Sequence, residues 1–425
     1  MPLSDMLEKL YARRRFGIRP GVDRIRLLLD RLGNPERTFK SIHVVGTNGK
    51  GSTSAFLSSI LTAAGHRTAL FTSPHLINFN ERFRINDHEV DEERLTHMLE
   101  KVLSNTPAEA TFFEIVTALG AFAFAEQGVE VAVMEAGMGG RSDATAALPG
   151  IMTIVTPISL DHCDYLGTTE EKIAEEKAGI IEQGSLAILG HQTPAVLNFL
   201  YSHCRHMASR CMFAGKDFSA AWESDGTLTY RGLNVHLPSL TPGISGRYQA
   251  DNAALALAAA ELLETAGVVT GNHALRQGLA AAHWPGRMEL VPGNPPLLLD
   301  GAHNPAGAAA LATSLADYRY NRLLLVIGIM ADKDRHSILA PLISLAFTCY
   351  CVTPTIERAL DGTVLAAELM LDGVTAIGFS SVAEGITAAR KEAGPGDLIV
   401  VCGSLFTVGE AKSWLQGIQF VGVRG

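Results

Sequence analysis

The sequence alternates short β-branched and apolar runs with stretches of helical periodicity, and this alternation limits the possible folds more than any other feature. In the first half the runs are SIHVVG, RTALFTSP, VEVAVMEAG, IMTIVTPIS and SLAILG. Between them stand helical patterns such as SAFLSSILTAAG, EIVTALGAFAFAEQ and EEKIAEEKAGII. Strands that alternate with helices indicate βαβ units, so we predict an α/β protein with a mostly parallel sheet.

A chain of 425 residues is longer than one hydrophobic core usually organises, which predicts two domains. A Pro/Gly-rich segment at residues 285–296 interrupts the periodicity, and the strand and helix pattern restarts after it with LLLD, RLLLVIG, CYCVTP, TAIGF and DLIVVCGS. We therefore divide the chain into domains 1–290 and 291–425. Residues 213–240 instead alternate polar and apolar residues around Asp-Gly and Arg-Gly turns, which predicts a small antiparallel excursion.

Composition narrows the class of protein. A formal net charge of -9 argues against non-specific nucleic-acid binding, because affinity for phosphate backbones comes from clustered Lys and Arg. The sequence has no apolar run of about 18 residues, the length that a membrane span needs. The six cysteines are not spaced as in a disulfide framework. We expect a monomeric cytoplasmic enzyme that binds neither nucleic acid nor membrane.

The strongest local motif is VVGTNGKGSTSAF, in which an apolar strand runs through a glycine-rich loop into a helix. Such a loop lets backbone N-H groups approach phosphate oxygens at a helix N-terminus. Lys50 is placed to reach the β and γ phosphates of a nucleotide, and the Ser52 hydroxyl to bind Mg²⁺. The string departs from the usual P-loop pattern, because Gly51 follows the lysine and Gly46 lies only three residues before Gly49.

Two further strands of the first half end in polar or glycine-rich residues. The second predicted strand ends in Thr72, Ser73 and Pro74, and the third runs from VAVM into Glu135 and a loop of glycines. Loops that follow parallel strands meet at one edge of the sheet. An acidic residue at this edge can hold a metal next to a P-loop, so Glu135 is a candidate ligand.

The fourth strand ends at His162, which two carboxylates, Asp161 and Asp164, flank. A histidine with carboxylate support is a candidate metal ligand. In the helix after it, TTEEKIAEEKAGII, Lys177 follows Glu175 and Glu176. Propensity alone predicts a solvated surface helix, and only an inward-facing Lys177 would change that interpretation.

The second domain repeats the pattern of an acid followed by glycine at a strand end. LLLD ends in Asp300, and His303 follows shortly after. Asp300 is suited to a ribose or base contact, and His303 to a phosphate contact from the opposite domain. Asn252 and Arg287 lie near the boundary between the domains, where an arginine can close onto a nucleotide as a charge stabiliser.

Taken together, these strings resemble one enzyme family. GTNGKGST, TSPHL, FFE, EAGMGGRSDAT, LDHCDYLG, EKAGI, NAALALAA, PGR, DGAHNP and VCGSLFTV occur in an order and spacing similar to those of the folylpolyglutamate synthase and dihydrofolate synthase family of the Mur ligase superfamily. The resemblance covers nearly the whole chain. It implies an N-terminal P-loop Mur-ligase-like α/β domain and a smaller C-terminal Rossmann-like α/β domain, with the active site in the cleft between them.

The resemblance also implies roles for individual residues. ATP would be bound by Asn48, Gly49, Lys50, Gly51, Asn252, Arg287 and Asp300. Mg²⁺ would be bound by Ser52, Ser73, Glu135 and His162, and Lys177 would be carbamylated to help place a metal. The pterin side would be bounded by Thr111, Phe112, Phe113, Glu114, Ser142, Asp143 and Ala144. Ser142 and Ala146 stand where the family often has leucine and asparagine.

The implied reaction joins L-glutamate to dihydropteroate, to a reduced folate, or to both. ATP would phosphorylate the acceptor carboxylate, and the amine of glutamate would attack the acyl phosphate. One alternative is another Mur-type amino-acid ligase, although only about forty residues precede Gly46, fewer than an added UDP-binding domain needs. The other is a nucleotide-binding module that ligates nothing. A dinucleotide oxidoreductase fits less well, because no GxGxxG follows the first strand.

Overall fold

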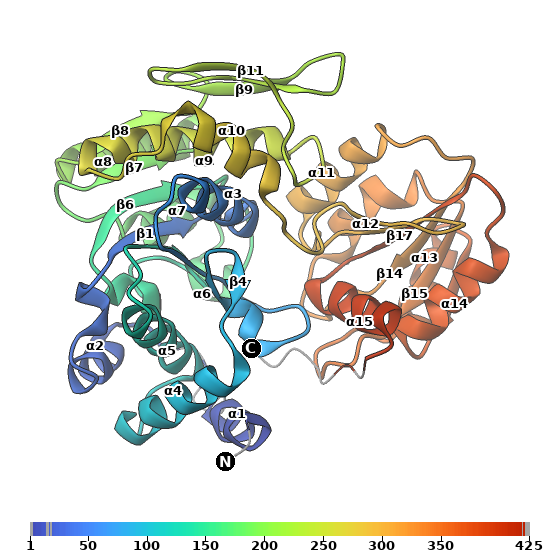
Figure 1. Cartoon of the computed structure of the whole chain (residues 1–425). Helices are drawn as coiled ribbons and strands as arrows, with labels where there is room; N and C mark the ends of the chain where they lie inside the picture. The colour runs from blue at the N-terminus through green and yellow to red at the C-terminus, as the bar shows by residue number, and fades with distance from the viewer. Residues whose placement is uncertain (1–2, 14–16, 18, 419, 421–425) are drawn as a thin grey trace.

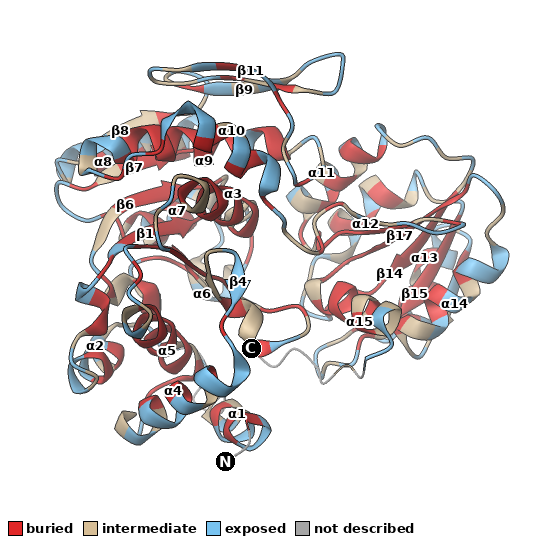
Figure 2. Ribbon diagram, in the orientation of Figure 1, coloured by how far each residue is buried: buried red, intermediate tan, exposed pale blue. Residues whose placement is uncertain are grey.

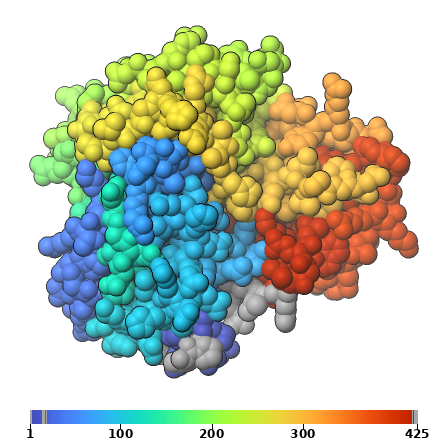
Figure 3. Space-filling view, in the orientation of Figure 1, coloured from blue at the N-terminus to red at the C-terminus, as the bar shows by residue number. Residues whose placement is uncertain are grey.

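A computed structural model describes residues 3–13, 17, 19–418 and 420 of the chain. Figure 1 shows two α/β parts side by side, with the yellow-to-orange segment passing from one to the other. In the space-filling view the orange and red C-terminal part lies directly against the blue and cyan N-terminal part (Figure 3). The predicted fold class, two α/β domains with mostly parallel sheets, is confirmed.

The first sheet has eight strands in the order β4-β3-β2-β5-β1-β6-β7-β8. All neighbours pair in parallel except β2 with β3 and β3 with β4, which are antiparallel. The five strands predicted in this half are present; β3, β4 and β8 are additional. Their bounds are β1 (Lys40–Val45), β2 (Thr68–Phe71), β3 (Phe83–Ile85), β4 (His88–Glu89), β5 (Val131–Glu135), β6 (Gly150–Val155), β7 (Leu186–Leu189) and β8 (Arg210–Phe213).

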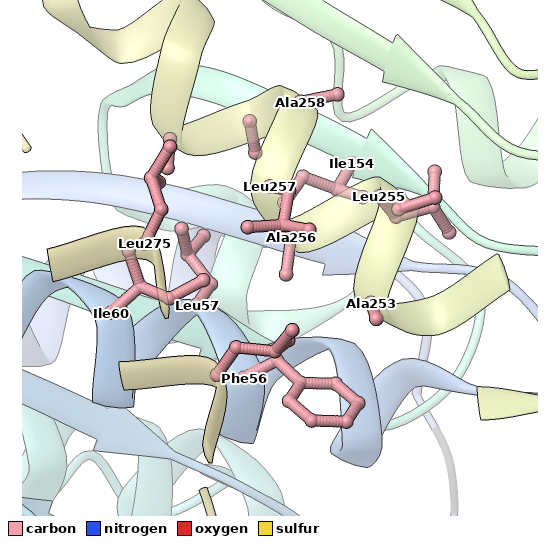
Figure 4. Packing of buried hydrophobic residues seen from close by; sticks show 14 of the residues in the cluster. Phe56, Leu57, Ile60, Ile154, Ala253, Leu255, Ala256, Leu257, Ala258 and Leu275 are labelled. Carbon is pink, nitrogen blue, oxygen red and sulfur yellow. The ribbon is translucent and has the colours of Figure 1, made fainter. Parts of the chain in front are cut away.

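Helices cover both faces of this sheet because side chains alternate along each strand. Ile42 and Val44 of β1 point into a core shared with α3, α9 and α10, where Phe56 and Leu57 lie beside Leu257 (Figure 4). The opposite face packs against α5, with α1, α2 and α4 outside it, and against α7 and α8. The helices are α1 (Leu3–Tyr11), α2 (Asp23–Arg31), α3 (Lys50–Ala63), α4 (Glu92–Asn105), α5 (Phe112–Glu126), α6 (Cys163–Leu166), α7 (Glu170–Ala178), α8 (Pro194–His206), α9 (Gln249–Leu263) and α10 (Gly271–Ala281).

The predicted antiparallel excursion is a separate three-stranded sheet of β9 (Ser219–Trp222), β10 (Leu228–Arg231) and β11 (His236–Leu240). It lies over α9 at the top of Figure 1. Tyr230 donates a hydrogen bond of 2.6 Å to Glu261 of α9, which also accepts from the backbone N-H groups of Leu233 and Asn234. The buried carboxylate thus fastens this sheet to the first domain.

The second sheet has six strands in the order β12-β13-β17-β14-β15-β16, all parallel except the edge strand β12. The division at residues 290 and 291 stays a prediction; β12 of the second sheet begins at Glu289. The elements are β12 (Glu289–Val291), β13 (Leu297–Leu299), α11 (Pro305–Leu315), β14 (Leu323–Ile327), α12 (Arg335–Ile343), β15 (Thr348–Val352), α13 (Gly362–Leu371), β16 (Ala376–Phe379), α14 (Val382–Glu392), β17 (Leu398–Cys402) and α15 (Leu405–Gln416).

Figure 2 shows the strands of both sheets as buried and the outer faces of the surrounding helices as exposed. None of the helices in the described part of the chain combines the length and apolar composition that a bilayer crossing requires.

Candidate active site

The glycine-rich loop connects β1 to α3, and two of its glycines are required by close contacts. A Cβ atom on Gly46 would lie 1.9 Å from Thr156 Oγ1, and one on Gly49 would lie 2.3 Å from Asn252 Oδ1. Both residues also have positive φ angles, of 142° and 87°, which side chains disfavour. The loop therefore keeps bare backbone at the start of α3, as a phosphate cradle needs.

Lys50 is the first residue of α3, and its ammonium folds back over this loop. Lys50 Nζ donates to the carbonyl oxygens of Gly46 and Thr47 at 3.3 and 3.2 Å. These are neutral acceptors, and Lys50 itself is only partly buried. Within the described part of the chain Lys50 forms no ion pair at salt-bridge distance, although its charge acts on Glu135, so the ammonium is available to an anion in the loop.

Gln249 is a site residue that the sequence did not indicate. Its side chain is fully buried, donates from Nε2 to Ser52 Oγ at 3.2 Å, and accepts from Asn252 Nδ2 at 2.8 Å. Asn252 in turn accepts from Thr53 Oγ1 at 3.5 Å. This chain of hydrogen bonds joins α9 to the first turn of α3, so it brings the predicted residues Ser52 and Asn252 together.

Glu135 ends β5 beside the glycine-rich loop. Its carboxylate accepts from the backbone N-H of Ser73 at 3.3 Å and is 5% exposed. Burial raises the pKa of Glu135, while the Lys50 ammonium, the Ser73 amide and the Arg287 guanidinium act in the opposite direction. The predicted residues Lys50, Ser73, Glu135 and Arg287 therefore share one site, with Arg287 contributed from beyond α10.

Lys177 faces inward, so the surface-helix interpretation of α7 is wrong. Its side chain is buried together with Ile173, Ala174 and Ala178 on one stripe of the helix. Burial, and next the Lys50 ammonium, lower the pKa of Lys177 to about 7, against the attraction of Asp143, Asp161 and Glu176. Glu176 therefore acts on Lys177 although the two residues are consecutive in α7.

Asp161 is the point where the two domains meet. Lys333 Nζ donates to Asp161 Oδ1 at 2.6 Å, and Asn304 Nδ2 to Asp161 Oδ2 at 3.3 Å. His303 Nε2 lies 3.5 Å from the same Oδ2 atom. Burial alone would raise the pKa of Asp161, but hydrogen bonding from His303 and the charges of His162 and Lys333 hold it well below its ordinary value.

His162 follows Asp161 in a left-handed conformation, with a φ angle of 52°. Desolvation of its imidazole lowers the pKa of His162 to about 4, with Asp161 raising it and Lys333 and Lys50 lowering it further. Its imidazole is therefore neutral near pH 7, which is the form that binds metals. Of the two flanking carboxylates, Asp161 belongs to the site, whereas Asp164 is exposed.

The second domain contributes strand-end residues that are already well hydrogen-bonded. Asp300 accepts from Tyr248 OH at 2.8 Å and from the backbone N-H groups of Met288 and Ala302 at 3.0 and 2.9 Å. Asn304 and Asn48 exchange hydrogen bonds of 2.9 and 3.2 Å across the cleft. The predicted residues Asn48, Asp300 and His303 therefore lie at the junction of the two domains.

The residues expected on the pterin side divide into two kinds. Thr111 and Glu114 form a capping box at the start of α5, Glu114 also pairs with Arg24 at 2.9 Å, and Phe112 stacks on Tyr11 at 5.6 Å. Only Phe113 reaches the glycine-rich loop after β5, where a Cβ on Gly137 would meet its ring at 2.6 Å.

Ser142, Asp143 and Ala144 lie on that same loop. Ser142 N donates to Glu176 Oε1 at 2.9 Å, and buried Asp143 accepts from the backbone of Met138 and Thr145 at 2.9 Å. Ala144 is buried. The loop is thus fastened to the end of α7, next to Lys177.

The donors around Glu135 fit a hard cation. Among the described residues no three His, Cys, Asp or Glu side chains converge as a complete protein-only metal cage. Mg²⁺ does not need one, because it usually keeps several waters and is held by one or two protein ligands together with substrate phosphates. A buried carboxylate, the hydroxyls of Ser52 and Ser73 and a neutral imidazole beside the loop are donors of this kind.

Two families match the chain and define its class. Residues 44–260 match the Mur ligase middle domain, and residues 286–405 match the family described as Mur ligase, glutamate ligase domain. With a P-loop domain, a second α/β domain and charged strand ends in the cleft, the chain is a Mur-type ligase.

Similarity to curated relatives shows which family of Mur-type ligases the chain belongs to. A Bacillus subtilis dihydrofolate synthase/folylpolyglutamate synthase is 33% identical, over 97% of this chain and 99% of the relative. The chain belongs to the folylpolyglutamate synthase/dihydrofolate synthase family. A probable bifunctional folylpolyglutamate synthase/dihydropteroate synthase of Halobacterium salinarum is 36% identical over 94% of this chain, which spans only half, 50%, of that relative's length.

Solved structures agree with this assignment. An Escherichia coli protein in complex with DHPP and ADP superposes with a TM-score of 0.90 at 32% identity, over 98% of both chains. A bifunctional folylpolyglutamate synthase/dihydrofolate synthase of Yersinia pestis, complexed with AMPPNP and Mn ion, gives a TM-score of 0.89 at 31% identity, again over 98% of both chains. Nucleotide binding with a divalent metal is therefore a property of the fold's relatives.

Proposed function

We propose that this chain is an ATP-dependent ligase that adds L-glutamate to dihydropteroate and to the γ-carboxylate of reduced folates. The observation that carries the proposal is the convergence of Lys50, Glu135 and Lys177 of the first domain with Arg287 of the segment that joins the two domains, linked through the charges that shift the pKa values of Glu135 and Lys177. Family membership supports the choice of glutamate and a pterin carboxylate over the substrates of other Mur-type ligases.

The nucleotide would lie along the glycine-rich loop. Its phosphates would accept hydrogen bonds from the loop amides of Asn48, Gly49 and Gly51 and from Lys50, whose present acceptors are neutral carbonyls. The site would be completed from α9, the joining segment and the second domain by Asn252, Arg287, Asp300 and His303. Asp300 already accepts three hydrogen bonds, so it is a rigid acceptor that could take a ribose hydroxyl on a remaining lone pair.

We propose Mg²⁺ as the divalent metal, held by Ser52, Ser73, Glu135 and His162 together with the phosphates. When bound, it would supply positive charge against the phosphate oxygens. The protein's own part is to hold the donors: Gln249 fixes the Ser52 hydroxyl, and Asp161 holds the loop that carries His162.

The residues suit chemistry that passes through an acyl phosphate. The acceptor carboxylate attacks the γ-phosphorus of ATP and ADP leaves, so the carboxylate becomes an acyl phosphate with a good leaving group. The amine of glutamate then attacks the carbonyl carbon, inorganic phosphate departs, and the amine loses a proton. Lys50 and Arg287 would offset the negative charge of the transferring phosphoryl group.

Lys177 is proposed to be carbamylated. With its pKa lowered to about 7, roughly half of the amine is neutral near pH 7 and can attack CO₂. The product is an anion with oxygen donors, suited to a hard cation next to the Lys50 ammonium. An unmodified ammonium there would repel both Lys50 and a metal.

The acceptor preference, oligomeric state and cellular location belong to the proposal as well. We propose that both dihydropteroate and tetrahydrofolate are accepted, that the chain acts as a monomer and that it works in the cytoplasm. The six cysteines are free thiols in the structure, as in proteins of reducing compartments.

One assay tests the proposed function. The chain is incubated with ATP, Mg²⁺ and labelled glutamate, with dihydropteroate or tetrahydrofolate as the acceptor. We expect glutamate-dependent ADP release and label in the pterin product with each acceptor. Activity with one acceptor only would restrict the chain to a single ligation, and acceptor-independent ATP hydrolysis without labelled product would favour a nucleotide-binding module instead.

A further inference from the structure

A cavity lies between the first sheet and the segment that joins the two domains. Its walls come from the loop after β2, from β3 and from Trp284, Pro285 and Arg287 of the joining segment, with Leu405 of α15 closing one side. Gly51 of the glycine-rich loop, Ser73 and Glu135 line the same cavity. An occupant of this cavity would therefore reach from the proposed phosphate site to the side chain of Arg84.

Arg84 lines this cavity with a charge that is only partly compensated. Its guanidinium lies over the ring of Trp284, 5.3 Å from the ring centre, and its side chain is only 15% exposed. Arg84 Nε is buried without a hydrogen-bond acceptor. Its ion-pair partner Glu89 is 3.8 Å from NH2 and is itself 42% exposed, so water screens that pair.

The two glutamates that line the cavity, Glu81 and Glu135, interact with groups other than Arg84. Glu81 accepts three hydrogen bonds, from the backbone N-H groups of Leu76, Ile77 and Asn78. Glu135 faces Lys50 and Arg287. A buried guanidinium N-H without an acceptor, such as Arg84 Nε, is costly, and a carboxylate is the group whose geometry matches a guanidinium best.

Trp284 connects this end of the cavity to the phosphate site. A Cβ atom on Gly51 would lie 2.7 Å from Trp284 Nε1, so the indole packs directly on the glycine-rich loop while Arg84 lies over its ring. The aromatic ring thus holds the guanidinium at a defined distance from the phosphate site. The side chain of an arginine exposed on the surface would not be held in one position in this way.

We propose that Arg84 and Trp284 form a subsite for a carboxylate of a glutamyl group. This inference rests on the proposed function and deepens it, since it assigns a binding residue to one of its substrates. The carboxylate can come from two sources, the incoming glutamate or the glutamyl tail of a folate acceptor. Dihydropteroate has no such tail, so the two acceptors distinguish the sources.

The test compares Arg84→Gln and Arg84→Lys with a matched control. Arg390→Gln removes another arginine that lies over a tryptophan, Trp414 at 5.1 Å, but on the outer helices of the second domain. Kinetics with each acceptor give KM for glutamate, acceptor and ATP. Calorimetric titration of L-glutamate into the chain with a non-hydrolysable ATP analogue measures binding apart from ligation.

Arg84→Gln is expected to raise one KM by about tenfold to a hundredfold, as loss of hydrogen bonds to a charged group does, with KM for ATP unchanged. Arg84→Lys should fall between the wild type and Arg84→Gln, and Arg390→Gln should match the wild type. A higher KM for glutamate with both acceptors, together with weaker glutamate binding, assigns the subsite to the incoming amino acid. A higher KM for tetrahydrofolate alone assigns it to the tail.

Unchanged glutamate and acceptor constants in Arg84→Gln, in an active enzyme, would overturn the subsite and leave the proposed function intact. An inactive wild type would overturn the proposed function. Calorimetric titration of both L-glutamate and tetrahydrofolate would then still decide on the subsite, because equal binding of each ligand by the wild type and Arg84→Gln, or no binding of either ligand, contradicts it.

Discussion

The strand ends of the two sheets meet at one cleft but treat their charged groups differently. In the first domain Glu135 and Lys177 are buried, and burial shifts the pKa of each toward its neutral form. In the second domain Asp300 accepts three hydrogen bonds and Lys333 pairs with Asp161 at 2.6 Å. The difference indicates that the charged groups of the first domain are available to bind substrates. The charged groups of the second domain instead fix the relative position of the two sides of the cleft.

Removal of the loop lysine should give the largest effect, because it takes away a charge that faces substrate and has only neutral acceptors in the protein. We predict that Lys50→Ala lowers kcat by about a thousandfold, the upper range for a group that stabilises developing charge. The thermal unfolding temperature should stay near that of the wild type. Near-wild-type turnover of Lys50→Ala would show that this lysine does not take part in the reaction, and it would contradict the role assigned to the first domain.

Substitution of Lys177 should have the second-largest effect, because the lysine is proposed to act indirectly, by binding a metal ion. We predict that Lys177→Ala lowers the rate of acyl phosphate formation by about a hundredfold, as loss of a group that orients metal ligands does, with a smaller change in ATP affinity. Lys177→Arg should not rescue the rate, because arginine cannot form a carbamate. Mass spectrometry under CO₂ should show the modification in the wild type; an unmodified lysine with a fully active alanine variant would contradict it.

The central strands of the two sheets provide a stability test. His43 is fully buried in β1, donates to the Leu148 carbonyl from Nε2 at 3.0 Å, and has a pKa lowered to about 4 by burial. The central strands β14 and β17 of the second sheet contain only apolar residues and cysteine. Of these central strands, only β1 contains a histidine, the group that titrates between pH 4 and pH 7.

Because the folded His43 resists protonation, the unfolded state binds more protons between about pH 6.5 and pH 4. The contribution is fully present above pH 6.5 and is lost as the pH falls, by roughly 2 kcal/mol between pH 7 and pH 5. His43→Gln, which keeps a donor for Leu148, should lose less stability over this range. Thermal unfolding at both pH values checks this, and equal losses in both proteins would contradict it.

The smallest effect is expected at the junction of the domains. Lys333→Met removes the partner of Asp161 and should lower kcat/KM by about tenfold, the cost of one hydrogen bond between charged groups. Arg335→Met is the matched control, because Arg335 pairs with Glu368 at 3.4 Å on the surface of the same domain. If the two variants lose the same activity, the second domain's contact with Asp161 does not hold the cleft in shape.

The sequence predicted the elements whose signals are local. β1, β5 and β6 are mostly buried strands rich in apolar and β-branched residues, and the glycines of the loop are required where the pattern places them. The β3 and β4 hairpin was missed because its strands are three and two residues long, too short to show alternation. Residues 173, 174, 177 and 178 do form a helical stripe, so the inward face of α7 could have been read from their spacing.

Contacts between distant segments could not be predicted in this way. Lys333 and Asp161 are 172 residues apart in the chain, and Gln249 and Ser52 are 197 residues apart. Nothing in the local pattern of either residue marks its partner, because the partner is chosen by how the two domains and α9 pack. The same holds for Arg84 and Trp284, which meet only where β3 faces the joining segment.

The acyl phosphate is the central claim, and isotope transfer tests it most directly. An acceptor whose carboxylate carries ¹⁸O is ligated to glutamate, and the inorganic phosphate released is analysed by mass spectrometry. If the carboxylate oxygen attacks the γ-phosphorus and later leaves with it, one ¹⁸O atom should appear in phosphate for each amide formed. Amide formation with phosphate free of ¹⁸O would contradict the account.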